Sequence, residues 1–282
     1  MSTERIGRYE ILKRLGRGGM ATVYLGHDPF IRREVAIKVM SAQLMENDPT
    51  FFDRFQQEAE TIAALEHPAI VPIYDFGHQG DQSYIVMRYM SGGTLEDRLG
   101  QGPMKLQEIA PIIDRVAAAL DEAHRKGIIH RDIKPANVLF DTKNDAFLSD
   151  FGIAKSTAAG AGLTADNTFI GTVEYMSPEQ IQGEKDLDGR TDVYSLGIVL
   201  FFMLTGKLPF KKNTLVSTIL AHLTEPVPSV QAALPQSRLP WDEILNKALA
   251  KDRADRYHTA GDLAKDVNSL LSGKWYLNKL LD

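Results

Sequence analysis

Two short polar runs in this chain of 282 residues combine the residue types and the spacing that phosphoryl transfer needs. They are His130-Arg131-Asp132-Ile133-Lys134-Pro135-Ala136-Asn137 and, shortly afterwards, Asp150-Phe151-Gly152. Asp132 could accept the proton of an attacking hydroxyl, and Lys134 could neutralise a migrating phosphate. Asn137 and Asp150 offer the oxygen ligands that Mg²⁺ prefers. Each run alone is equally compatible with a surface turn, so it is their joint occurrence, in this order, that indicates chemistry.

A glycine-rich segment near the N-terminus could bind the phosphates of a nucleotide. It lies between two expected strands and reads Gly16-Arg17-Gly18-Gly19-Met20-Ala21-Thr22. Because glycines lack side chains, their backbone amides can approach phosphate oxygens closely. A glycine cluster alone is more often only a turn. Here it precedes Lys38, which stands on an otherwise apolar strand and, if buried, needs anionic partners such as phosphates and a carboxylate.

Two glutamates on the first predicted helix compete to be that carboxylate. A helix over residues 51–65 is indicated by apolar residues at three- and four-residue steps, namely Phe51, Phe55, Ala59, Ile62 and Leu65. Glu58 lies close to this apolar stripe, whereas Glu60 lies well away from it. We therefore expect Glu58 to pair with Lys38; the alternative is that both glutamates simply solvate the helix.

The pattern of the whole chain predicts an α+β fold. Strands are expected at residues 9–15, 22–25, 35–40, 70–76 and 84–89. After Gly93 the periodicity becomes helical, with helices over residues 94–99 and 106–126, then a small hairpin, then further helices. We expect a five-stranded antiparallel sheet with one main helix in residues 1–90. A mainly helical lobe in residues 91–282 would complete a single domain.

Composition narrows the classes of function. The net charge is −5 and no basic stripe occurs, which argues against non-specific binding of nucleic acid. There is no cysteine, so disulfides, thiolate catalysis and zinc–thiolate sites are excluded. The N-terminus lacks the apolar core of a secretory signal. The longest uncharged run, residues 193–206, is too short to span a membrane and predicts a buried helix instead.

In order and spacing, these motifs resemble those of the eukaryotic-like (Hanks-type) serine/threonine protein kinases, particularly their bacterial branch. The resemblance covers about residues 9–271 and implies the bilobal protein-kinase fold. It runs through Gly16-x-Gly18, Val35-Ala36-Ile37-Lys38, Glu58, His130-Arg131-Asp132, Asn137, Asp150-Phe151-Gly152, Ser177-Pro178-Glu179, Asp192 and Arg256. The implied activity is transfer of the γ-phosphoryl group of ATP to serine or threonine hydroxyls of proteins, with Mg²⁺, or Mn²⁺ in its place.

The resemblance also implies roles for single residues. Lys38 would orient the α- and β-phosphates and pair with Glu58, while Asp132 and Lys134 would serve the transfer itself. Asn137 and Asp150 would hold the magnesium. The adenine would lie between Leu15, Val23, Ala36 and Leu139 and bond the backbone carbonyl of Arg88 and amide of Met90. Met87 would control the back pocket of the nucleotide site, and the phosphates would contact the glycine-rich segment.

Regulation is expected to act through the segment between residues 150 and 179. Arg131, directly before Asp132, is of the type that binds a phosphate on this segment. We expect autophosphorylation of Thr164 and Thr168 and a substrate-positioning role for Thr172. The alternative is that these threonines, like most Ser and Thr residues in such loops, only keep the segment hydrated.

The resemblance also implies that several residues are structural. His130 would pack under Phe151 and bond the loop rather than act as a base, and Ile62 and Ile73 would extend that stack. Asp192 would cap the backbone of the catalytic loop, and Glu179 would form a buried ion pair with Arg256. Three departures from the family pattern, Ala21, Ser177 and Arg88, remove no catalytic group, and we expect Ser177 to be without consequence.

Two other functions compete with this interpretation. A pseudokinase would bind nucleotide or partners without catalysis, but Lys38, Asp132, Asn137 and Asp150 are all intact. A small-molecule phosphotransferase would not need the peptide-docking motifs Gly171-Thr172 and Ser177-Pro178-Glu179.

We expect protein substrates, no nucleic acid, no membrane segment in this chain and a homodimer through the N-terminal lobe. The expected location is the cytoplasm, alone or as the cytoplasmic domain of a longer membrane-anchored kinase.

Overall fold

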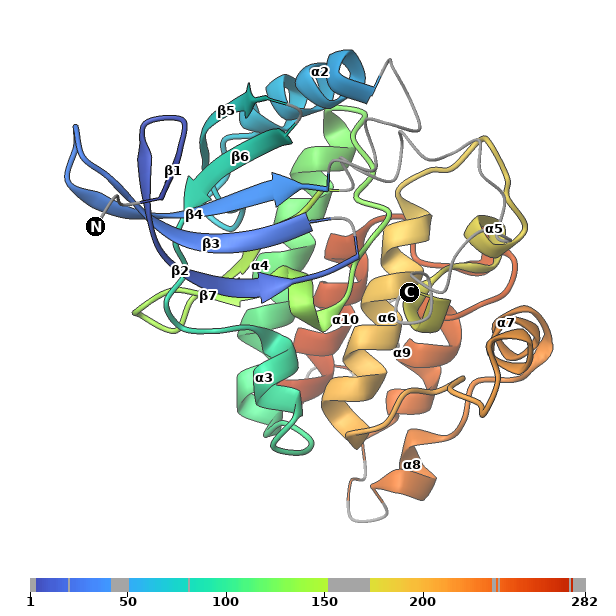
Figure 1. Cartoon of the computed structure of the whole chain (residues 1–282). Coiled ribbons are helices and arrows are strands. Elements are labelled where there is room, and N and C mark those ends of the chain that lie inside the picture. The colour runs from blue at the N-terminus through green and yellow to red at the C-terminus, as the bar shows by residue number, and fades with distance from the viewer. Residues whose placement is uncertain are drawn as a thin grey trace. The chain divides into compact units, whose positions relative to one another are not determined.

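The computed structural model describes residues 4–19, 21–41, 51–80, 82–151, 173–234, 237, 239–273 and 275. The described residues up to Ser91 form one compact unit, and those from Gly92 onward form a second (Figure 1). Each unit has a core of its own and is built from different elements, so the two are described in turn.

The first unit is built on a six-stranded antiparallel sheet. Its strands are β1 (Arg5–Ile6), β2 (Tyr9–Arg17), β3 (Ala21–Asp28), β4 (Arg33–Met40), β5 (Ile73–Gln79) and β6 (Gln82–Arg88), in the spatial order β1-β2-β3-β4-β6-β5. All five expected strands are present, but the predicted count was one short. The extra strand, β1, pairs only two residues with β2, which is too short to show a period of two in the sequence.

Successive side chains along β4 point alternately to the two faces of the sheet. Val35, Ile37 and Val39 point to one face, where they form a buried cluster with Tyr9, Tyr84 and Val86. Ala36 and Lys38 therefore point to the other face. The single helix of this unit, α2 (Phe51–Ala63), packs beside β5 and buries Phe55, Ala59 and Ile62, as its predicted stripe requires.

The second unit is mainly helical. Its helices are α3 (Leu95–Leu99), α4 (Leu106–Arg125), α5 (Pro178–Ile181), α6 (Arg190–Thr205), α7 (Leu215–Thr224), α8 (Val230–Ala233), α9 (Trp241–Ala248) and α10 (Ala260–Leu271). A two-stranded hairpin, β7 (Val138–Phe140) and β8 (Ala146–Leu148), lies between α4 and α5 in the chain. The expected helices at 94–99 and 106–126 and the expected hairpin are confirmed within one residue at each end.

Helix α6 forms the centre of the second unit, with α4, α8, α9 and α10 packed around it (Figure 1). It contains most of the long uncharged run, and 13 of its 16 residues are buried, which confirms that this run is an interior helix. Gly206 ends the helix in a left-handed conformation with φ of 69°. Within the described residues, no helix is both long and apolar enough to cross a membrane.

Candidate active site

The loop from His130 to Asn137 is held by a buried carboxylate on α6. Asp192 is fully buried and accepts hydrogen bonds from the backbone N–H groups of His130, at 2.8 Å, and Arg131, at 2.9 Å. Its Oδ2 also lies 2.7 Å from Nε2 of His124 on α4. The predicted capping role of Asp192 is therefore confirmed. Arg131 adopts a left-handed conformation with φ of 63°, which a non-glycine residue holds only when its surroundings fix it.

His130 packs inside the second unit and is engaged through both ring nitrogens. Nε2 lies 2.9 Å from the carbonyl oxygen of Ser149, and Nδ1 accepts the backbone N–H of Asp132 at 3.2 Å. Its ring centroid lies 4.6 Å from that of Phe151. Burial lowers the pKa of His130, so the ring is neutral. The predicted structural role is confirmed, because no ring nitrogen remains to act as a base.

Two of the predicted catalytic-loop residues, Lys134 and Asn137, converge on the carboxylate of a third, Asp132. Lys134 Nζ lies 2.9 Å from Oδ2 of Asp132. The amide nitrogen of Asn137 donates to the backbone oxygen of Asp132 at 2.8 Å and to its Oδ2 at 3.2 Å. Asp132 and Lys134 are half-buried, whereas Asn137 is only 4% exposed. Because the amide nitrogen is used in this way, the side-chain oxygen of Asn137 is the atom it can offer to a cation.

Backbone contacts bring the second predicted metal ligand beside the first. Ser149 donates to the backbone oxygen of Asn137 through its N–H, at 2.9 Å, and its hydroxyl, at 3.1 Å. Asp150 follows directly and has a φ of 60°. In the described part of the chain, no three His, Cys, Asp or Glu side chains are grouped to hold a metal. Two oxygen donors completed by phosphate and water are nevertheless what Mg²⁺ commonly uses, so Asn137 and Asp150 fit that ion.

In the first unit, the glycine-rich segment joins β2 and β3 as a hairpin. Gly16 is paired with Val23 and Arg17 with Thr22, and Gly18 N–H donates to Ala21 O at 2.8 Å. Met20 lies outside the described residues. A Cβ atom on Gly16 would meet no protein atom within 4 Å. Neither packing nor a left-handed backbone therefore requires glycine at this position, and the predicted contact of this segment with phosphates stays a prediction.

The predicted nucleotide contacts of the sheet share one face. In register, Val23 pairs with Lys38, Lys38 with Ile85, and Ala36 with Met87, and directly paired residues point to the same side. Lys38 is half-buried on this face, opposite the cluster of Val35, Ile37 and Val39. Leu15 is 41% exposed near the end of β2.

Of the other predicted contacts, Arg88 and Met90 lie in the chain just before the boundary of the two units, and Leu139 lies within the second unit. Arg88 donates its backbone N–H to Pro72 O at 3.0 Å, and Met90 is buried. Leu139 belongs to β7 of the second unit, where it bridges to Thr94. These positions do not by themselves establish an adenine site, so the roles of Arg88, Met90 and Leu139 stay predictions.

The two candidate glutamates of α2 differ in their surroundings. Glu58 is half-buried, whereas Glu60 is exposed and accepts a hydrogen bond from Gln56 at 3.0 Å. This difference in burial follows the position of each glutamate relative to the apolar stripe of α2. It favours Glu58 over Glu60 as the carboxylate for Lys38. Its pairing with Lys38 stays a prediction.

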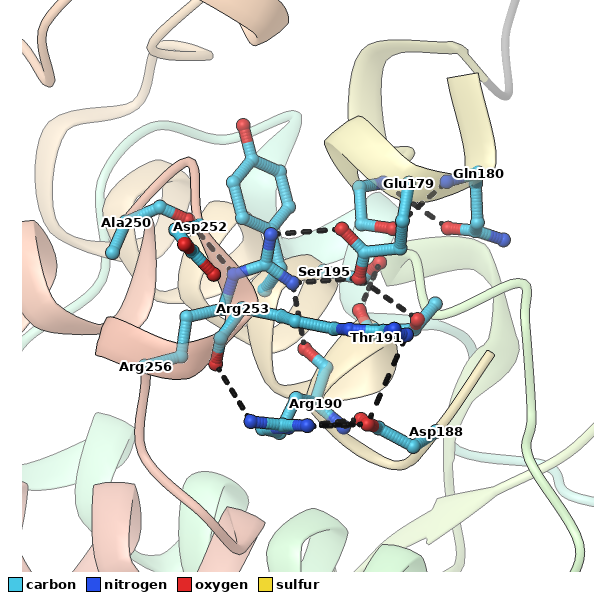
Figure 2. Close-up of polar contacts among 12 residues, drawn as sticks. Glu179, Gln180, Asp188, Arg190, Thr191, Ser195, Ala250, Asp252, Arg253 and Arg256 are labelled. Carbon is cyan, nitrogen blue, oxygen red and sulfur yellow. Dashed lines mark hydrogen bonds and ion pairs between the residues drawn. The ribbon is translucent and has the colours of Figure 1, made fainter. Parts of the chain in front are cut away.

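The predicted regulatory residues Thr164, Thr168 and Thr172 lie outside the described residues. Just beyond them, Glu179 and Arg256 form the predicted buried ion pair, with oxygen–nitrogen distances of 2.6 and 2.8 Å (Figure 2). Burial opposes ionisation of Glu179, but the hydrogen bonds and charge of Arg256 prevail and lower its pKa below 4.5.

Two polar residues at this site were not predicted. His124, which contacts Asp192, carries no signal in the sequence beyond its place on an amphipathic helix. Gln180 donates to the backbone oxygen of Arg131 at 3.0 Å. The sequence did contain a signal for Gln180, because Ser177-Pro178-Glu179-Gln180 has the Ser-x-x-Gln pattern of a capping box.

Comparison with known proteins agrees with this geometry. The protein kinase domain model matches residues 9–270. The chain is 42% identical over 264 residues to serine/threonine-protein kinase PrkC of Bacillus subtilis, covering 93% of this chain and 40% of that protein. It is also 42% identical over 274 residues to serine/threonine-protein kinase PknB of Mycobacterium tuberculosis, covering 95% of this chain and 43% of that protein.

Solved structures give the same result. The crystal structure of the Mycobacterium tuberculosis PknI kinase domain matches with a TM-score of 0.76 and 30% identity, covering 96% of this chain and 99% of that one. The chain spans only about two fifths of the length of PrkC and PknB. The match over nearly all of the chain nonetheless decides its family. The chain therefore belongs to the protein kinase family, as a serine/threonine protein kinase domain of the bacterial branch.

Proposed function

We propose that this domain transfers the γ-phosphoryl group of MgATP to serine and threonine hydroxyls of proteins. The observation that carries this proposal is the convergence of Lys134 and Asn137 on the carboxylate of Asp132, at 2.9 and 3.2 Å. A base, a cation and a metal ligand thus meet on one loop. Protein kinases as a family use ATP and Mg²⁺, which supply the phosphoryl group and neutralise its charge.

The residues of the second unit divide the work between them. Asp132 orients the acceptor hydroxyl and accepts its proton late in the transfer. Lys134, beside it, stabilises the negative charge that moves between the two oxygens. Asn137 and Asp150 hold the cation through their side-chain oxygens. Most of the rate enhancement then comes from positioning and charge rather than from covalent chemistry.

The residues of the first unit bind the nucleotide. Lys38, paired with Glu58, orients the α- and β-phosphates, and the amides of the glycine-rich segment approach them. Residues 1–90 and 91–282 act as the two lobes of a single catalytic domain. The continuous match of the family model over residues 9–270 supports their belonging to one domain.

One labelling experiment tests the activity. Radiolabelled ATP is incubated with a generic basic protein and with the wild type, Asp132→Asn or Lys38→Met. We expect label in the protein with the wild type and a loss of most of it with either variant. Equal label in all three samples would remove the enzyme proposal, and label only in a small molecule would favour a different phosphotransferase.

The domain is activated by its own phosphorylation of Thr164 and Thr168. Nε of Arg131 is buried and has no hydrogen-bond partner among the described residues, which supports a role in binding an anion. Thr172 positions the substrate. Mass spectrometry of protein expressed with and without Asp132→Asn tests this. Phosphate on both threonines of the variant, with no other kinase present, would refute self-modification.

Two copies of the domain pair through their first units. The turn between β3 and β4 exposes two large apolar side chains, Phe30 at 77% and Ile31 at 56%. Beside them, the half-exposed Arg8 contacts Asp28 at 3.3 Å and Asp75 at 3.5 Å. Light scattering should show a concentration-dependent dimer that Ile31→Asp abolishes. The control Leu220→Asp, at an equally exposed apolar site on α7, should leave it intact; a dimer lost only in the control would contradict the proposal.

The substrates are proteins, and the place of action is the cytoplasm, where ATP is abundant. The relatives PrkC and PknB are longer than this chain, so the same domain is proposed to act alone or as the cytoplasmic part of a membrane-anchored kinase. Fractionation of cells that express the full-length gene product tests the choice. Recovery with the membrane pellet would favour the anchored form.

A further inference from the structure

Gln180, the third residue of helix α5, contacts both the start of its own helix and the catalytic loop. Ser177 N–H donates to Oε1 of Gln180 at 3.1 Å, and Gln180 N–H lies 3.4 Å from the hydroxyl of Ser177. The other end of the same side chain, Nε2, donates to the backbone oxygen of Arg131 at 3.0 Å. In Figure 2 the side chain of Gln180 points away from Arg256, whereas that of the adjacent Glu179 points toward it.

The orientation of this amide is fixed by its two partners. Oε1 faces a donor, the N–H of Ser177, and Nε2 faces an acceptor, the carbonyl of Arg131. Rotating the amide by half a turn would place donor against donor and acceptor against acceptor. Neither Glu nor an apolar residue could satisfy both partners at neutral pH.

The carbonyl that Gln180 binds belongs to the peptide that leads into Asp132. The N–H of that same peptide donates to Nδ1 of His130 at 3.2 Å. Both polar groups of the peptide are therefore held, one by Gln180 and one by His130. Because this peptide is rigid and planar, holding both of its polar groups fixes the position of the Cα atom of Asp132, from which the side chain leaves the backbone.

The preceding residue needs such support. Arg131 has a φ of 63°, and a non-glycine residue keeps this left-handed conformation only where its surroundings hold it. Its N–H is held by Oδ1 of Asp192 at 2.9 Å, and its carbonyl is held by Gln180. Asp192 and Gln180 thus act on opposite sides of the same strained residue.

We propose that Gln180 is a positioning residue for Asp132 and couples the start of α5 to the catalytic loop. This inference rests on the proposed role of Asp132 in phosphoryl transfer. The N–H that orients the amide of Gln180 belongs to the backbone of Ser177, so this contact does not depend on serine at position 177. The side chain of Gln180 thus joins Ser177, directly before α5, to the peptide that leads into Asp132.

Two variants and a matched control test the proposal. Gln180→Met is close in shape but makes neither hydrogen bond, and Gln180→Glu keeps the acceptor while turning an oxygen toward the Arg131 carbonyl. Gln182→Met makes the same change at an exposed position just after the same helix. Loss of alignment at a reacting group costs between about 10- and 100-fold in rate. We expect that fall in kcat for both Gln180 variants, an unchanged KM for ATP, and wild-type kinetics for Gln182→Met.

Amide hydrogen exchange supplies a readout that does not depend on activity. The N–H of Asp132 should exchange severalfold faster in Gln180→Met than in Gln182→Met, while amides in the middle of α6 exchange equally in both. A wild type without kinase activity would overturn the proposed function, yet the exchange at Asp132 would still decide the role of Gln180. Wild-type kcat in both Gln180 variants, or unchanged exchange at Asp132, would overturn the inference. If Gln180→Met proves unstable, Gln180→Glu decides by the same two measurements.

Discussion

Glu179 and Arg256 form a two-pronged ion pair in the interior of the second unit, 77 residues apart in the chain. The side chain of Arg256 is fully buried and that of Glu179 is 4% exposed. Arg256 also donates to the carbonyl oxygens of Ala250, Lys251 and Arg190, at 2.8, 3.1 and 3.2 Å. Thr191 donates to Glu179 at 2.9 Å (Figure 2). The pair therefore joins α5, the start of α6 and the segment before α10 into one network.

Arg256→Met should lower the free energy of unfolding by about 3–5 kcal/mol, because it leaves the buried Glu179 carboxylate unpaired. Urea unfolding measures the loss. Arg253→Met is the matched control, since Arg253 is partly exposed and its ion pairs with Glu184 and Asp188 measure 3.8 and 4.0 Å. Such surface pairs contribute about 0–1 kcal/mol. Equal losses in the two variants would contradict the special role of the buried pair.

The same pair predicts how stability depends on pH. The pKa of Glu179 is lower in the folded protein than its usual 4.5, because the bonds and charge of Arg256 outweigh the effect of burial. The unfolded state therefore binds the proton first as the pH falls. The contribution is complete above the unfolded pKa and is lost as the pH falls through the folded pKa. The difference in unfolding free energy between wild type and Glu179→Gln should accordingly shrink between pH 6 and pH 3. A constant difference would show that Glu179 keeps its ordinary pKa.

Two glycines should respond differently to alanine. A Cβ on Gly92 would lie 2.6 Å from the backbone oxygen of Asp141, whereas a Cβ on Gly16 would meet nothing within 4 Å. Gly92→Ala should destabilise the protein by about 1–3 kcal/mol through overpacking.

Gly16→Ala should leave the melting temperature unchanged. It should nevertheless raise the KM for ATP roughly three- to tenfold, since it obstructs one hydrogen bond to phosphate. Calorimetry and steady-state kinetics measure both, and an unchanged KM for Gly16→Ala would argue against phosphate at this loop.

The burial of Lys251 predicts a second rise of stability with pH, this one at alkaline pH. Its Nζ lies over the ring of Phe210 at 3.9 Å and 3.4 Å from the oxygen of Ala221. Burial, followed by the charge of Arg256, lowers its pKa to about 8, although Glu225 opposes the shift. Between pH 8 and the unfolded pKa, the unfolded state binds more protons, so stability rises with pH there.

Urea unfolding at pH 7 and pH 9.5 tests this, with Lys251→Met as the reference in which all other titrations cancel. The wild type should gain stability relative to the variant at the higher pH. A relative loss at the higher pH would mean that the folded protein favours the charged amine.

The parts of this molecule that the sequence could predict are those where chemistry restricts the residue type. Asp132, Lys134, Asn137 and Asp150 could be recognised because a base, a cation and oxygen ligands are needed within one short stretch of chain. The phase of α2 separated Glu58 from Glu60 because burial of an amphipathic helix repeats every 3.6 residues. The buried run of α6 could be identified because an uncharged helix of that length has no polar face.

The features that were missed depend on contacts between distant segments. β1 consists of two residues, so no periodicity can reveal it. His124 and Gln180 are polar residues on helices, where most positions of this kind only face water. Their roles follow from the approach of α6 to α4 in one case and of α5 to the catalytic loop in the other. Neither approach is encoded in local spacing.

The most direct test of the central claim asks which phosphate of ATP reaches the protein and where it is attached. A generic basic protein is incubated with the domain and ATP labelled at either the γ- or the α-phosphate, and the product is hydrolysed to its amino acids. The predicted result is label from γ-labelled ATP alone, recovered as phosphoserine and phosphothreonine, and lost with Asp132→Asn. Label from α-labelled ATP, label on tyrosine, or label that persists with Asp132→Asn would contradict it.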